Sequence, residues 1–292
     1  MDNIENIPAI NWFPGHMAKA GREIGESLKL TDCSVALVDA RIPSSSYAPE
    51  LDGLLKGKPC VIAMSKSDLA DEAENVRWVK YFNDTGKHAI LVDNVTGRGF
   101  DALRKTVSRI LAPKNEADRR KGMRPRAPRL MVVGIPNVGK STFINKLANR
   151  SGAKTADRPG VTRAQQWIKV KGGYDLLDTP GILPPRYEDK NATLRLAFIG
   201  SIKDEVFDGV EVAALLCGFL RGRYPNSLIN RYKLDPVDTL SCDEILTEIA
   251  KARGFLMKGG EADIERAAAI LLDEFRAGKL GRITLETVDA QC

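Results

Sequence analysis

One loop constrains this chain more than any other feature: residues 134–141 read GIPNVGKS. They match the phosphate-binding loop GxxxxGK[ST], and they stand between an apolar run at 130–133 and a helical pattern at 142–148. In such a loop the glycines let backbone N–H groups curl around phosphate oxygens at the start of a helix. Lys140 would supply a charge to the outer phosphates, and the Ser141 hydroxyl would ligate Mg²⁺. The sequence therefore predicts a nucleoside triphosphate site.

Short apolar runs alternate with helical patterns as far as residue 180, which is typical of an α/β fold with a mostly parallel sheet. Six strands are expected, at 34–39, 60–64, 89–92, 130–134, 167–171 and 174–178. The last two flank Gly172-Gly173, a hairpin signal, so one of them should be antiparallel. Beyond residue 190 apolar residues recur at helical spacing, in 212–220, 243–252 and 264–275. We therefore expect two domains, 1–190 and 191–292.

Composition excludes several classes of protein. With 43% hydrophobic and 28% charged residues the chain reads as an ordinary globular protein. No apolar run approaches the roughly 20 residues that span a bilayer, and the first residues lack the pattern of a signal peptide. The five cysteines are scattered and the histidines number two. This usage predicts reduced thiols in a cytoplasmic protein rather than a disulfide framework or a His-rich metal site.

Positive charge is concentrated in the first domain. The net charge is +6, yet residues 190–292 hold 14 basic and 16 acidic side chains, so the excess lies in 1–189. The stretch 114–129 alone has seven basic and two acidic residues. Two interpretations stay open for it. It is either a solvated linker or a contact with nucleic-acid phosphates, whose strength would fall steeply with salt.

Two short motifs follow the phosphate loop. DTPG at 178–181 ends an apolar strand, where Asp178 can hold Mg²⁺ through water and the N–H of Gly181 can sense a γ-phosphate. Alone, DxxG is usually a turn, but 38 residues beyond the phosphate-loop Lys140 it strongly indicates a second element of the nucleotide site. In PGVT at 159–162, Thr162 would close over Mg²⁺ as a switch residue.

Two loops that come before the phosphate loop suit a base. Ser65-Lys66-Ser67-Asp68 follows the strand at 60–64, and the Asp68 carboxylate can accept both N–H groups on the Watson–Crick edge of guanine. Adenine does not offer that pair of donors. The segment 93–99 (DNVTGRG) follows the third strand and would pack over the base. Each loop has a common composition by itself, so the prediction depends on their combination with the phosphate loop.

Together these elements resemble the five signature motifs of a GTPase, with the two base motifs placed before the three phosphate motifs. This is the order of the circularly permuted GTPases. The runs 11–20 (NWFPGHMAKA) and 39–43 (DARIP) narrow the resemblance to the ribosome biogenesis GTPase A (YlqF-type) family, over nearly the whole chain. The resemblance implies a circularly permuted P-loop GTPase domain with a six-stranded, mostly parallel sheet. A small helical domain that helps bind ribosomal RNA would follow it.

The resemblance also implies a function. The chain would hydrolyse GTP to GDP and phosphate as an assembly factor for the large (50S) ribosomal subunit. It would bind rRNA or the precursor subunit in the GTP state and leave after hydrolysis, as a cytoplasmic monomer with no membrane partner. The alternative is an RNA-binding nucleotide sensor with little turnover. The presence of Lys140, Ser141, Thr162 and Asp178 disfavours it, and Asp68 disfavours a small-molecule kinase that uses ATP.

Several residue roles come from the resemblance alone. Asn137 looks like the asparagine that helps hold K⁺ beside the phosphates. Ile182 stands where other GTPases have the glutamine that orients water. His16 is the family's candidate for positioning that water, while helix capping and RNA contact stay open for it.

Contacts with GTP or GDP are expected from Ser65, Lys66, Ser67, Asp68, Asp93, Asn94, Val95, Asn137, Val138, Gly139, Lys140, Ser141, Thr142, Pro180 and Gly181. The expected catalytic residues are His16, Lys140 and Thr162. The expected metal ligands are Ser141, Thr162 and Asp178 for Mg²⁺ and Asn137 for K⁺.

One position departs from the family pattern. The base motif usually begins with asparagine, whose amide reaches guanine N7 and ties the base loop to the phosphate loop, whereas this chain has Ser65. A serine can make at most one of these contacts, so a lower nucleotide affinity is expected. Selectivity for guanine would then depend mainly on Asp68.

Overall fold

The computed structural model describes residues 25–47, 50–55, 57–148, 166–170, 173–179 and 189–291. These residues fall into two compact units. The nucleotide-loop unit contains the described residues up to 179 together with 286–291, and the helical unit contains 189–285. The division expected from the sequence assigned 286–291 to the helical domain. In the structure residues 286–291 belong to the nucleotide-loop unit instead.

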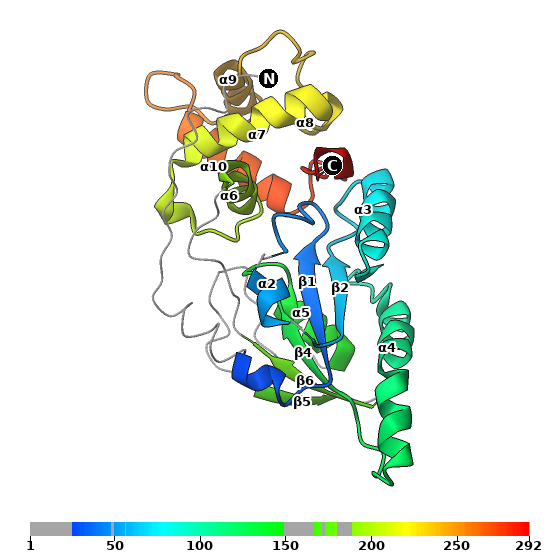
Figure 1. The fold of residues 1–292 in the computed structure, drawn as a ribbon. Helices are drawn as coiled ribbons and strands as arrows, with labels where there is room; N and C mark the ends of the chain where they lie inside the picture. The colour runs from blue at the N-terminus through cyan, green and yellow to red at the C-terminus, as the bar shows by residue number, and fades with distance from the viewer. Residues whose placement is uncertain are drawn as a thin grey trace. The chain divides into compact units, whose positions relative to one another are not determined.

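A six-stranded sheet forms the centre of the nucleotide-loop unit (Figure 1). Its strands are β1 (Cys33–Asp39), β2 (Cys60–Ser65), β3 (His88–Leu91), β4 (Arg129–Val133), β5 (Gln166–Val170) and β6 (Tyr174–Asp178). Their order is β3-β2-β1-β4-β6-β5, and all neighbours pair in parallel except β5 with β6. The six predicted strands and the predicted hairpin are therefore confirmed, each strand to within one residue.

Helices cover the sheet, which explains why its central strands are almost wholly apolar. The helices are α2 (Glu50–Leu54), α3 (Glu72–Asp84), α4 (Phe100–Arg120) and α5 (Lys140–Ala148). α3 packs on β3, α4 on β2 and β3, and α5 on β4, β5 and β6. Strands that are buried on both faces read as continuous hydrophobic runs, as in CVIAMS of β2 and RLMVV of β4. Trp78 of α3 is fully buried against this core.

The parallel arrangement brings the chemically important loops together. The chain leaves β1, β2, β3, β4 and β6 at their carboxyl ends, and these ends lie along the same edge of the sheet. Ligands of open α/β sheets bind at that edge. The motifs that follow these strands therefore converge, although they are separated by more than a hundred residues in sequence.

The basic stretch 114–129 is only partly a linker. α4 continues through Arg120 despite Pro113 within it, and residues 123–128 are irregular. Ion pairs between residues four apart support the last turns: Lys114 with Asp118 at 2.9 Å, and Glu116 with Arg120. The first half of the stretch is therefore helical, and both interpretations of its charge, a solvated segment or a contact with nucleic-acid phosphates, stay open.

The helical unit contains α6 (Lys190–Phe198), α7 (Gly209–Arg223), α8 (Pro225–Tyr232), α9 (Cys242–Arg253) and α10 (Ile264–Arg276). α10 packs on α7 and α9. Local sequence sets the ends of α9: Ser241 and Glu244 form a capping box at its start, and Gly254 ends it with φ 66°. Among the residues described here, no helix is long and apolar enough to cross a membrane.

Candidate nucleotide-binding site

The phosphate loop joins the end of β4 to the first turn of α5. Asn137 and Gly139 adopt the left-handed region, with φ of 60° and 91°. A side chain at Gly134 would place its Cβ 2.4 Å from the backbone oxygen of Leu37, and one at Gly139 would meet the loop after β3 at 2.8 Å. Close approach of the Leu37 backbone requires glycine at 134, while the left-handed backbone requires it at 139. The loop lies at the N-terminus of α5, where backbone N–H groups suit an anion.

Lys140 begins α5 and is buried, with 8% of its surface exposed. Its ammonium group donates to the carbonyl oxygens of Gly134 at 3.0 Å and Ile135 at 2.7 Å. Burial lowers the pKa of Lys140 to about 8, and the nearby Asp178 carboxylate opposes that shift. The amine is thus held inside the phosphate loop, in a setting where the negative charge of a phosphate would favour its protonated form.

Asp178, at the end of β6, has the environment expected of a metal-binding carboxylate. It is 2% exposed, and its Oδ1 atom is buried without a hydrogen-bond partner among the described residues. Burial raises the pKa of Asp178, while Lys140 opposes the shift. A buried carboxylate oxygen without a partner is costly unless a ligand satisfies it. The hydroxyl residues Ser141 and Thr142 are half-buried in the first turn of α5. A carboxylate and a hydroxyl beside a phosphate loop fit Mg²⁺, which usually takes few protein ligands and keeps several waters.

Ser65 ties the base motif to the phosphate loop. Its hydroxyl lies 2.6 Å from the backbone oxygen of Val138 and 2.9 Å from that of Val38. The residue is fully buried at the end of β2. A hydroxyl has one proton to donate, so Ser65 keeps the loop-to-loop contact and has no further donor for a base.

Lys66 extends this connection. Its ammonium nitrogen lies 2.8 Å from the backbone oxygen of Asn137 and 3.2 Å from Oδ2 of Asp39. Asp39 is fully buried at the end of β1 and also pairs with Arg41. Burial alone would raise the pKa of Asp39, but Arg41 and Lys66 hold it well below its usual range. From the sequence, Asp39 and Arg41 served only to identify the family resemblance, and no role in the site was predicted for them. Their place directly after a strand of the parallel sheet was the available signal.

The last two residues of the base motif differ in exposure. The Ser67 hydroxyl donates to the backbone oxygen of Val92 at 3.1 Å, and the Ser67 carbonyl accepts from the side chain of Asn75 at 2.9 Å. Asp68 is exposed. Ser67 is therefore committed to holding the loop, while the carboxylate of Asp68 faces solvent at the edge of the site.

The loop after β3 completes the arrangement. Asp93 accepts from the N–H groups of Val95 at 2.8 Å and Thr96 at 3.0 Å, so its carboxylate closes the turn. The pKa of Asp93 is lowered: burial pushes it up, but hydrogen bonds from Thr96 outweigh burial. The side chain of Asn94 donates to the Gly139 backbone oxygen at 3.3 Å, and its own oxygen is buried without a partner in the described part of the chain. Val95 is 75% exposed.

The described members of the predicted site therefore meet at one edge of the sheet. Five of the residues assigned by sequence, or tied to its mechanism, lie outside the described residues: His16, Thr162, Pro180, Gly181 and Ile182. The roles given to them stay predictions.

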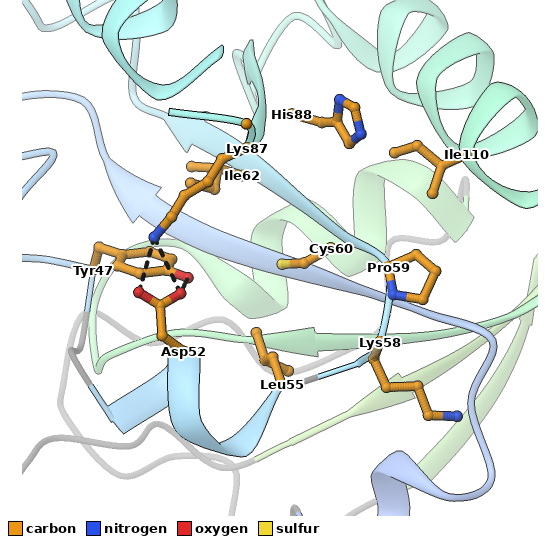
Figure 2. A pocket seen from close by; sticks show the side chains of 11 residues that line it. Tyr47, Asp52, Leu55, Lys58, Pro59, Cys60, Ile62, Lys87, His88 and Ile110 are labelled. Atoms are coloured by element: carbon orange, nitrogen blue, oxygen red, sulfur yellow. Dashed lines mark hydrogen bonds and ion pairs between the residues drawn. The ribbon is translucent and has the colours of Figure 1, made fainter. Parts of the chain in front are cut away.

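A separate cavity of about 280 Å³ lies at the opposite end of the strands, where β2 and β3 begin (Figure 2). Three of its polar side chains are paired with one another: Lys87 contacts both carboxylate oxygens of Asp52, at 3.0 and 3.1 Å, and lies over the ring of Tyr47. Burial raises the pKa of Cys60 to about 12, so this thiol stays protonated at neutral pH. Of the predicted motifs, none contributes a described residue to this cavity.

Sequence comparisons with known proteins identify the same kind of nucleotide site. A family model described as "50S ribosome-binding GTPase" matches residues 129–216. Ribosome biogenesis GTPase A of Bacillus cereus is 46% identical over 280 residues, which covers 95% of this chain and 94% of the relative. The protein of the same name from Thermotoga maritima is 31% identical over 284 residues, with 95% and 94% covered.

Solved structures show the same similarity in three dimensions. The GDP-bound structure of TM YlqF superposes with a TM-score of 0.65 at 29% identity, covering 92% of this chain and 100% of that one. GNP-bound YlqF from T. maritima gives 0.64 at 29% identity, covering 92% and 98%. The α/β fold with a six-stranded, mostly parallel sheet and a GTPase domain is thus confirmed. The chain belongs to the ribosome biogenesis GTPase A family, and it is a GTPase.

Proposed function

We propose that this GTPase is an assembly factor for the large ribosomal subunit. It binds ribosomal RNA or a precursor subunit with GTP in its site, and it leaves after hydrolysis. The relatives' names and the 50S ribosome-binding family model support the ribosomal role. The observation that carries the nucleotide part is the joining of the base motif to the phosphate loop, through Ser65 with Val138 and Lys66 with Asn137.

Different residues of the site contact the base and the phosphates. The Asp68 carboxylate accepts from the guanine N–H groups, and Lys66 flanks the base while it holds the phosphate loop. When GTP binds, the ammonium of Lys140 turns from the carbonyls of Gly134 and Ile135 to the phosphate oxygens. The loop with Asn94 and Val95 packs over the base.

Ser141 and Asp178 are the described residues that would hold Mg²⁺, Ser141 directly and Asp178 through water. The bound ion neutralises charge that develops on the phosphate oxygens. Thr162 would add a ligand as a switch residue, and Gly181 would sense the γ-phosphate beside Pro180. Asn137 would help to hold K⁺, and His16 would position the attacking water.

The electrostatic attraction for RNA comes from the basic stretch of the first unit, but not from all of it. Arg126 forms two hydrogen bonds with Asp32, at 2.7 and 2.9 Å, and Lys114 lies 3.2 Å from the same carboxylate. Arg120 pairs with Glu116 on the same helix. The other exposed cations of the stretch, Arg119, Lys121 and Arg124, are the ones we assign to phosphate contacts. In the helical unit Arg231 is likewise engaged, by Glu274.

A GTPase assay with and without purified large subunits, in K⁺ and in Na⁺, tests this proposal. We expect slow turnover by the protein alone, faster turnover in K⁺, and a further rise when large subunits are added. Small subunits are the matched control and should give no rise. Turnover that stays unchanged with large subunits, together with tight binding to them, would instead support the RNA-binding nucleotide sensor.

A further inference from the structure

The end of the chain makes a buried contact with the loop after β1. Glu286 is 3% exposed, and its carboxylate accepts from the N–H groups of Ser44 at 2.7 Å and Ser45 at 3.0 Å, and from the Ser45 hydroxyl. Its backbone carbonyl accepts from the indole N–H of Trp78 at 3.2 Å. Hydrogen bonds to an ionised carboxylate belong to the strong class. We call residues 286–291 the C-terminal clasp.

Apolar packing holds the clasp as well. Val288 lies against the hydrophobic cluster that includes Trp78 and Phe82. The short helix η3 (Val288–Gln291) contacts α3. The clasp is therefore an integral part of the nucleotide-loop unit, although the helical unit precedes it in the chain.

The loop that the clasp holds is bonded back to the end of β1. The hydroxyl of Ser46 accepts from the N–H of Asp39 at 3.0 Å and donates to the Ile42 carbonyl at 2.6 Å. Arg41 donates to both carboxylate oxygens of Asp39, at 2.9 and 2.8 Å. Asp39, Arg41 and Ser46 are all at most 1% exposed. Such a closed, buried network transmits displacement because its members have little room to adjust.

The Asp39 carboxylate also contacts the base motif. Oδ2 of Asp39 is 3.2 Å from the ammonium nitrogen of Lys66, which is 2.8 Å from the backbone oxygen of Asn137. A continuous series of contacts thus runs from Glu286 through residues 44–46 and Asp39 to Lys66 and the phosphate loop.

We propose that the C-terminal clasp positions Lys66 for the guanine nucleotide, which makes Glu286 a positioning residue for nucleotide affinity. The proposal rests on the role given to Lys66 under the proposed function. Glu286 directly follows Leu285, the last residue of the helical unit. A partner that binds the helical unit and displaces the clasp would therefore weaken nucleotide binding. By linkage, bound nucleotide would lower the protein's affinity for that partner by the same factor.

The test uses the full chain with Glu286→Gln and, on the other side of the contact, Ser45→Ala. Titration with fluorescent GDP gives Kd, and steady-state GTP hydrolysis gives KM and kcat. We expect Kd and KM to rise about 5-fold or more, the lower end of typical coupling between sites. kcat should stay at the wild-type value, because the clasp touches no reacting atom. The control is Asp289→Asn, an exposed carboxylate of the same segment, which should change neither constant.

A double-mutant cycle separates positioning from a loss of stability. In a Lys66→Met background, Glu286→Gln should cost no further GDP affinity, because its effect passes through Lys66. Additive losses would overturn the proposal, as would wild-type GDP affinity in the Glu286→Gln protein. If Glu286→Gln lowers the melting temperature too far for titration, Ser45→Ala, which removes a single hydroxyl, decides by the same criteria.

The cycle also distinguishes two failures. If Lys66→Met itself binds GDP like the wild type, the base-site role of Lys66 is wrong, and the clasp proposal falls with it. If Lys66→Met weakens GDP binding while the Glu286 and Ser45 variants do not, only the clasp proposal is wrong.

Discussion

The hydroxyl of Ser65 lies 2.6 Å from the backbone oxygen of Val138, so the first residue of the base motif holds the phosphate loop directly. The family pattern has asparagine at this position, with an amide that serves both the loop and the base. Here the loop contact is kept with a shorter side chain. This residue therefore links the two halves of the nucleotide site.

Ser65→Ala should weaken GDP binding about 3- to 15-fold, the equivalent of one buried hydrogen bond. The Val138 carbonyl would lose its partner, and the phosphate loop would be less well held before nucleotide binds. Titration with fluorescent GDP measures the effect. Ser108→Ala, on the exposed side of α4, is the matched control and should bind normally. Equal affinity of the two variants would contradict a role for Ser65 in the site.

Asp68→Asn should remove the preference for guanine. The carboxylate accepts two N–H groups, whereas an amide offers one acceptor and one donor. Xanthine carries a carbonyl in place of the guanine amino group, so the variant should favour XDP over GDP by about 10-fold or more. Competition of GDP, XDP and ADP against a fluorescent nucleotide reports the order. A variant that still prefers GDP would show that other groups read the base.

GDP affinity should fall as the pH rises above about 8. The pKa of Lys140 is lowered to about 8 in the folded protein, and bound phosphates favour its charged form. Above that pH, binding must take up a proton, so Kd should rise up to about tenfold per pH unit; below it, Lys140 adds no pH dependence. Titrations from about pH 7 to 9.5 measure this. Lys140→Met should bind weakly and lack the alkaline slope, and a wild-type slope in that variant would assign the proton elsewhere.

Arg119→Gln, Lys121→Gln and Arg124→Gln together should weaken binding to the large subunit and reduce its salt dependence. Each lost phosphate contact flattens the log–log slope by roughly 0.7 to 0.9. Arg126→Gln is the informative comparison, because Arg126 is paired with Asp32. It should lower the free energy of unfolding and leave the salt slope almost unchanged. Sedimentation with subunits at several salt concentrations provides the measurement. Equal slopes for the triple variant and the wild type would remove this stretch from the interface.

His16→Ala should reduce the subunit-stimulated GTPase rate about 100-fold and leave GDP affinity unchanged. A group that positions or deprotonates the attacking water contributes on this scale. Single-turnover hydrolysis with and without large subunits separates the two effects. If the stimulated rate survives, His16 is a capping or RNA-contacting residue.

The amino-acid sequence by itself determined the framework and predicted the motifs of the nucleotide site. Continuous apolar runs between helical patterns predicted six strands because a sheet covered by helices buries both faces of its central strands. GIPNVGKS, SKSD and DTPG each follow such a run, and carboxyl ends of parallel strands share an edge, so their convergence was predictable. These are local signals: a period, a turn residue, a motif of a few positions.

Tertiary structure alone decided which charged and polar side chains form ion pairs and hydrogen bonds within the protein. Arg126 pairs with Asp32 across 94 positions, and Glu286 holds Ser45 across 241. No periodicity or spacing reports such partners, because each contact forms only when the sheet has brought distant loops together. The same holds for Asp39, whose burial beside Lys66 depends on β1 lying next to β2. The sequence thus placed the motifs on the strands, and packing decided which side chains hold them there.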